Sequence, residues 1–200
     1  MKNAFLAVAL SACCAVSQTV TTPLMPYKDG EASPTGYSGS MKDIEINGAA
    51  VTTTGWIVFD ATGRDLARTS SAQLELHVKR VEAPGTLRVH ALDSAIASPE
   101  NNVTLGDIYH GATAVATVPI GTESVETVLH IDVTSAVQAS PFFGFALVSD
   151  DGLGAFIDSR EGVMPPVVQL TYEIGDAAAK WYSGGGAPAS DLGSDGDYYL

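Results

Sequence analysis

The sequence predicts an all-β fold, an antiparallel β-sandwich of jelly-roll type with about nine or ten strands and one short helical turn. Short apolar segments alternate with Gly, Pro and Asp along most of the chain, which is typical of strands joined by tight turns. Residues 71–81 show the clearest alternation between apolar and polar side chains in the chain, as a half-buried strand does. No long segment places apolar residues at helical spacing. A closed β-barrel is the alternative arrangement of the same strands.

Length and charge limit the classes of protein to consider. The chain has 200 residues, enough for one domain with a core that needs no disulfides. It carries 10 Lys and Arg against 23 Asp and Glu, a formal net charge of -13. Nucleic acid is therefore not an expected partner, because its binding depends on Lys and Arg contacts to phosphate.

Residues 1–17 predict an export signal, since Lys2 precedes a short apolar stretch that small residues follow. The stretch is shorter than the roughly 20 residues that span a bilayer, so no transmembrane segment is expected. Two processing routes are open. Cleavage after Ser17 gives a secreted protein without cysteine, whereas cleavage before Cys13 gives a lipoprotein anchored at the bacterial envelope through that cysteine.

Three further regions follow the signal. Residues 18–26 are rich in Thr and Pro and predict an N-terminal arm, and residues 27–174 form the predicted sandwich domain. Residues 175–200 are rich in Gly, Asp and Ser and predict a flexible acidic tail. Within the domain, strands are expected at 41–47, 55–60, 71–81, 86–92, 112–118, 125–132, 142–148, 155–157 and 167–172, with Asp132 capping a helical turn at 133–139.

The segments 71–81 and 86–92 predict a hairpin that turns at Pro84. Its register would place His77 opposite His90 on the outer face, and Lys79 opposite Arg88. If Ile57 and Phe59 face the core, Trp56 faces outward as well. These five outward residues, Trp56, His77, Lys79, Arg88 and His90, are the candidate ligand site. An exposed indole stacks on a sugar ring, and basic groups pair with sugar carboxylates or sulfates. The alternative is an ordinary solvated sheet face, with Trp56 packed under the N-terminal arm.

The order of these features resembles the DNRLRE-type domain, also described as carbohydrate-binding module family 96. The segments that carry the resemblance are a Tyr-Gly turn at 36–39 before the strand at 41–47, the strands at 56–60, 72–78 and 87–92, Asp132-Val133-Thr134, and a closing series at 144–147, 159–161, 165–166 and 167–172. The resemblance implies an exported β-sandwich, and some members of that family resemble sugar binders, including alginate binders.

No catalytic motif is present, so an enzyme is not expected. No metal site is predicted from the histidines. Asp29, Asp150, Asp151 and Asp158 would form a calcium site if they converged, although tight turns use Asp in the same way. Ser159-Arg160-Glu161 is expected to be a structural turn that ties two strands together.

Two functions follow from the sequence. The first is an exported, non-catalytic carbohydrate-binding module, with acidic polysaccharide as the preferred ligand. The second is a structural or adhesive surface module that acts through protein contacts or self-association. A hydrolase or lyase is the third and least favoured class.

Overall fold

The computed structural model describes residues 18–48, 52–93, 96, 98–108, 110–111, 113–137, 141–174, 181–182 and 198–199. The predicted signal, Cys13 and most of the predicted tail lie outside these residues. The chain divides into a compact domain, Thr21–Tyr172, and a second unit made of the two chain ends. In that second unit β13 (Trp181–Tyr182) pairs in parallel with β14 (Tyr198–Tyr199).

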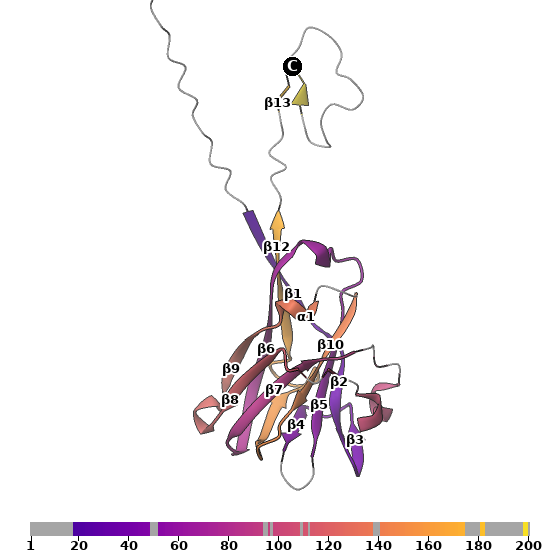
Figure 1. Ribbon diagram of the computed structural model, residues 1–200, viewed down its shortest axis with the longest axis vertical. Helices are drawn as coiled ribbons and strands as arrows, with labels where there is room; N and C mark the ends of the chain where they lie inside the picture. Colours follow the sequence, from indigo (N-terminus) through magenta and orange to yellow (C-terminus); the bar gives the residue numbers. More distant parts are fainter. Residues whose placement is uncertain are drawn as a thin grey trace, which may run out of the picture. The chain divides into compact units, whose positions relative to one another are not determined.

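Two six-stranded sheets form the sandwich, which confirms the all-β prediction (Figure 1). In sheet A the order is β1 (Gln18–Leu24), β12 (Val167–Ile174), β6 (Thr69–Ala83), β11 (Gly154–Asp158) and β4 (Asp43–Asn47), and β9 (Thr127–Asp132) also pairs with β6. In sheet B the order is β3 (Gly36–Ser38), β2 (Pro26–Ser33), β5 (Thr54–Asp60), β10 (Phe142–Val148), β7 (Gly85–Ala91) and β8 (Ala116–Ile120).

The main core lies between the two sheets and follows the predicted alternation. Leu74 and Leu76 of β6 and Leu87 and Val89 of β7 are completely buried in one cluster. Removing these side chains from water is the main favourable term in folding, at about 25 cal/mol per Å² of apolar surface. The inward faces of the strands were therefore predictable from their period of two.

A second core covers the outer face of sheet B. Ile96, Val103 and Ile108, from the long connection between β7 and β8, pack on Trp56 and Val58 of β5. Both faces of β5 are therefore buried, which explains why its apolar residues are nearly continuous instead of alternating.

The predicted hairpin is wrong, because β6 belongs to sheet A and β7 to sheet B. β6 pairs with β12 and β11, at different parts of its length, and with β9. β7 instead lies between β10 and β8. The chain crosses between the sheets at Pro84, which has no amide hydrogen to donate to a ladder. A period of two shows which face of a strand is buried, but it does not show which strand is the neighbour.

The segment predicted as an N-terminal arm contains strands that the sequence analysis did not expect. Residues 18–26 form β1 and the start of β2, and β3 follows, so the two sheets hold more strands than the nine or ten expected. β2 contains Lys28, Asp29 and Glu31 and has no apolar alternation. Its strand structure depends on pairing with β5 and β3, which local sequence does not encode.

The helical turn is α1 (Thr134–Val137), and Asp132 caps it as predicted. The Thr134 backbone amide donates to Asp132 Oδ1 at 3.0 Å, and the Thr134 hydroxyl donates to the same oxygen at 2.6 Å. Four short 3₁₀ turns were not predicted: η1 (Leu66–Arg68), η2 (Glu100–Asn102), η3 (Leu105–Asp107) and η4 (Thr122–Ser124). None of the helices among the described residues has the length and hydropathy to cross a membrane.

Candidate functional site

Trp56 does not form the exposed stacking surface that the sequence suggested. Its side chain is 0% exposed and packs in the second core beneath the connection that carries Val103 and Ile108. Its indole nitrogen has no hydrogen-bond partner within the described residues. Alternation does place Trp56 on the outer face of sheet B, but a distant segment covers that face in place of solvent.

The four predicted basic residues are divided between the two sheets and do not form one patch. In sheet A, His77 Nδ1 lies 2.6 Å from Asp158 Oδ2 and is nearly buried. Lys79 is ion-paired with Asp43 of β4. In sheet B, Arg88 Nη1 lies 3.0 Å from Asp150, and His90 is 5% exposed.

Both cations of this group are thus neutralised by carboxylates, and both imidazoles are nearly buried. The predicted basic patch of His77, Lys79, Arg88 and His90, which suggested an acidic ligand, is therefore not formed.

The four aspartates that would form a calcium site have separate partners. Asp29 accepts the Arg160 backbone amide, and Asp158 contacts His77. Asp151 accepts the Thr86 backbone amide at 2.9 Å and the Ser149 hydroxyl. These hydrogen bonds, led by those with Thr86, lower the pKa of Asp151 to about 2. Across the described parts of the chain, no three His, Cys, Asp or Glu side chains are grouped to hold a metal ion.

An exposed aromatic pair lies where β2 begins, β5 ends and β10 begins. Tyr27 is 51% exposed and Phe142 is 38% exposed. Their ring centroids are 6.2 Å apart at an interplanar angle of 71°. Lys28 Nζ lies 5.4 Å from the centroid of the Tyr27 ring, within the range of a cation–π contact. We refer to Tyr27, Lys28 and Phe142 as the aromatic platform.

A β-bulge explains why Tyr27 points away from the core. Pro26 is paired with Phe59 and Lys28 with Val58, so Tyr27 is an extra residue in β2 without a partner in β5. A bulge of this kind redirects one side chain and is frequent beside binding sites. Phe142 reaches the same surface by ordinary alternation, because its neighbour Phe143 faces the main core.

A network around Arg160 holds the bulge in place. The Arg160 guanidinium donates to the Tyr27 carbonyl, to Glu100 Oε2 at 3.0 Å and to Glu161 Oε1 at 2.7 Å. Glu100 also accepts the Asp29 backbone amide at 3.0 Å. We refer to Asp29, Glu100, Arg160 and Glu161 as the Arg160 corner.

The Arg160 corner connects β2, η2 and the segment after β11. Ser159, the first residue of the predicted structural turn, donates its hydroxyl to the Met41 carbonyl and so joins the segment before β4 to this corner. These contacts make the Ser159-Arg160-Glu161 turn the support of the aromatic platform.

Asp29 is the most perturbed acid of the corner. Its side chain is 1% exposed, and its Oδ1 atom has no hydrogen-bond partner within the described residues. Burial raises the pKa of this carboxyl to about 7, partly opposed by the hydrogen bond from the Arg160 backbone amide.

Apart from the aromatic platform, a polar hollow lies on the outer face of sheet A. A hollow of about 390 Å³ is lined mainly by hydroxyl and amide side chains with one carboxylate, those of Thr21, Ser71, Gln73, Asp132, Gln169 and Thr171. No aromatic ring is among the described residues that line this hollow. It offers hydrogen bonds to a ligand but no stacking surface, so the aromatic platform is the stronger candidate for sugar recognition.

No family model matches the chain, and no curated protein is significantly similar to it. The resemblance to DNRLRE-type domains therefore stays a prediction.

Proposed function

We propose that this protein is a non-catalytic carbohydrate-binding module whose sugar-stacking surface is the aromatic platform. The observation that carries the proposal is the exposed pair of Tyr27 and Phe142, which a bulge and the Arg160 corner hold at one end of sheet B. An exposed ring held by a rigid scaffold loses little conformational entropy when a ligand covers it. The apolar face of a pyranose is such a ligand.

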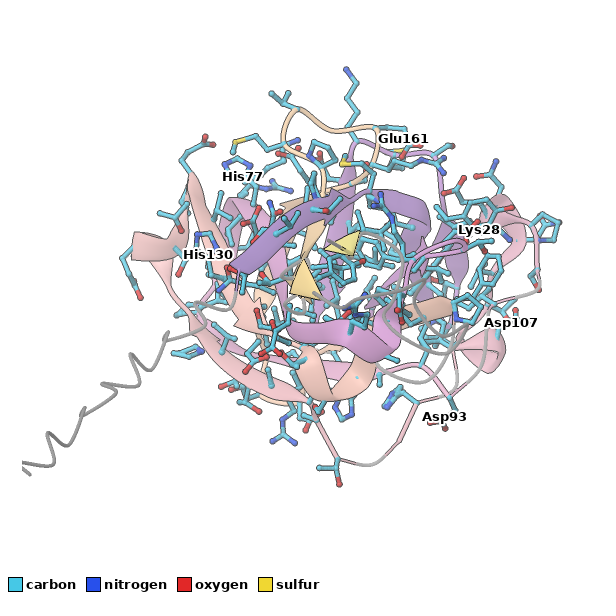
Figure 2. The ribbon with its side chains drawn as sticks, turned by 90° about the horizontal axis from the view of Figure 1, so that it is seen from above. Lys28, His77, Asp93, Asp107, His130 and Glu161 are labelled. Atoms are coloured by element: carbon cyan, nitrogen blue, oxygen red, sulfur yellow. The ribbon has the colours of Figure 1, made fainter. Side chains whose placement is uncertain are left out.

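Lys28 supports a preference for acidic polysaccharide. Its ammonium donates to the Ser98 carbonyl at 3.2 Å and forms no ion pair with any carboxylate of the described residues. An ammonium has three donors, so at least one stays available for a uronate or sulfate group beside the Tyr27 ring. Lys79 and Arg88 lack this freedom because each is paired with a carboxylate. Figure 2 shows that Lys28 and His77 lie on different sides of the domain.

Affinity electrophoresis tests the proposal directly. The protein without residues 1–17 is run through native gels that contain alginate, pectin or a neutral glucan. We expect retardation in the acidic gels, loss of retardation in Tyr27→Ala, and reduced retardation in Lys28→Gln. Arg88→Gln is the matched control, because it removes an equal charge from an ion pair outside the platform. Equal mobility of the native protein in every gel would overturn the proposal.

One observation favours the alternative, a structural or adhesive module. β8 and β9 are edge strands of different sheets that lie beside each other, and a cavity of about 620 Å³ between them is lined by Val115, Ala116, Val118, His130, Ile131 and Asp132, among others. Unpaired strand edges can pair with another chain. Light scattering during size-exclusion chromatography tests this alternative, since a monomer at millimolar concentration contradicts self-association.

A further inference from the structure

The polar hollow of sheet A is crossed by a row of three side chains from three different strands. Gln73 of β6 lies opposite Gln169 of β12 on one side and opposite Asp132 of β9 on the other. All three line the hollow, and its volume of about 390 Å³ is within the range of about 300–1,000 Å³ found for small-molecule sites. Strand pairing therefore fixes the spacing of three hydrogen-bonding groups that are far apart in the sequence.

The groups of this row keep hydrogen-bonding capacity for a ligand. The Gln73 carboxamide has no hydrogen-bond partner within the described residues. Asp132 accepts the Thr134 amide and hydroxyl through Oδ1 alone, so Oδ2 is left for a ligand. The Gln169 amide nitrogen donates to Glu75 at 3.3 Å, which leaves the Gln169 carbonyl oxygen as an acceptor. The bonds with Thr134 and Glu75 also hold two of the three side chains in position before a ligand arrives.

A second row in the same hollow supplies hydroxyl groups. Ser71 lies two positions before Gln73 and so faces the same side of β6. It is opposite Thr171 of β12, whose hydroxyl oxygen lies 3.0 Å from that of Thr21 in β1. The Ser71 hydroxyl has no partner within the part of the chain that the structure describes. This row therefore adds donors beside the acceptors of the first row.

The mixture of donors and acceptors selects the chemistry of the ligand. Hydrogen bonds with the Thr134 hydroxyl and backbone amide lower the pKa of Asp132, so it is a carboxylate at neutral pH. A ligand carboxylate or sulfate only accepts hydrogen bonds and would be repelled by this charge, and an ammonium only donates. A sugar hydroxyl both donates and accepts, so neighbouring hydroxyls of a neutral sugar match Asp132 Oδ2 and the Gln73 carboxamide together.

We propose that this hollow binds a neutral pyranose through its hydroxyl groups, as a second sugar site that does not depend on the aromatic platform. Figure 2 shows His130, two positions before Asp132 in β9, on the opposite side of the domain from Lys28 of the platform. The site makes hydrogen bonds that replace those of water and has no stacking surface, so we expect a Kd on the order of millimolar.

Nuclear magnetic resonance titration of the protein without residues 1–17 tests the proposal. The probes are the methyl glycosides of glucose, mannose and galactose, each added to about 100 mM. We expect saturable shifts of the side-chain amide signals of Gln73 and Gln169 with at least one probe. Sodium glucuronate should bind more weakly than methyl glucoside, because its carboxylate meets the charge of Asp132.

Two substitutions and one control locate the site. Gln73→Ala should weaken binding of the glycoside about fivefold to tenfold, because it removes both a donor and an acceptor. Asp132→Asn keeps the cap of α1, since asparagine is a good capping residue, and should reduce the preference for glucoside over glucuronate. Asn102→Ala is the matched control, because it removes an exposed carboxamide outside the hollow and should leave the affinity unchanged.

The amide spectrum of each variant verifies its fold before the affinities are compared. The proposal is overturned if no probe shifts the signals of Gln73 and Gln169, or if folded Gln73→Ala keeps the native affinity. Shifts confined to residues around Tyr27 would also overturn it, while leaving the aromatic platform as a sugar site. Failure of alginate and pectin to retard the protein would instead contradict the proposed function and leave this second site untouched.

Discussion

Replacing Asp29 with Asn should remove a pH-dependent penalty on folding. The Asp29 carboxyl is 1% exposed, and burial raises its pKa from the ordinary value of 3.8 to about 7. The folded state therefore holds this proton more tightly than the unfolded state does. Native stability is highest where the carboxyl is protonated in both states, below pH 4. It falls as the pH rises from about 4 to 7 and then levels off.

The size of the penalty follows from the shift. A difference of about three pKa units corresponds to about 4 kcal/mol, at 1.36 kcal/mol per unit. Relaxation of the Arg160 corner reduces this figure, so about 2 to 4 kcal/mol is the expected order of magnitude at pH 8. Asparagine has nearly the same shape, stays neutral and can still accept the Arg160 backbone amide through Oδ1.

Urea denaturation between pH 4 and 8 measures the effect. The free energy of unfolding of Asp29→Asn, minus that of the native protein, should grow by up to about 1.4 kcal/mol per pH unit between pH 4 and 7. It should be nearly constant above pH 7. Parallel pH profiles of the two proteins would show that Asp29 ionises as an exposed carboxyl does. That result would refute the claim that burial in the Arg160 corner raises its pKa.

Three further predictions concern single substitutions. Tyr27→Ala should weaken polysaccharide binding about 70-fold in calorimetry, because about half of a tyrosine's ~200 Å² is exposed, and ~100 Å² at 25 cal/mol per Å² is ~2.5 kcal/mol. An unchanged affinity would exclude Tyr27 from the site. Trp56→Ala should lower the free energy of unfolding in urea by about 3 to 5 kcal/mol, since the side chain is fully buried; a loss below 1 kcal/mol would contradict its place in the second core. Asp151→Asn should have the opposite pH dependence to Asp29→Asn. The pKa of Asp151 is lowered to about 2 by hydrogen bonds led by those with Thr86, so its stabilisation is present above pH 4 and is lost as the pH falls through 2. Chemical denaturation at pH 7 and pH 2 should show a deficit in the variant only at pH 7.

The candidate site was harder to predict than the fold. Tyr27 lies in a strand without apolar alternation, and its exposure depends on a bulge against β5, more than 25 positions away. The sequence places Phe142 in a strand, but it does not predict the contact with Tyr27. That contact depends on the pairing of β10 with β5. Tryptophan is a residue type that often stacks on sugars, but Trp56 is buried by a segment that begins some 40 positions later in the sequence.

What the sequence by itself determined was the class of fold and the inward face of each strand. Successive side chains of a strand point to opposite faces, so every second residue faces the core. This places Leu74, Leu76, Leu87 and Val89 inside. Only the tertiary structure decided which strands are neighbours, because backbone hydrogen bonds are the same for every pair of strands. That choice separated His77 from His90, placed Gln73 between Gln169 and Asp132 and set Tyr27 beside Phe142.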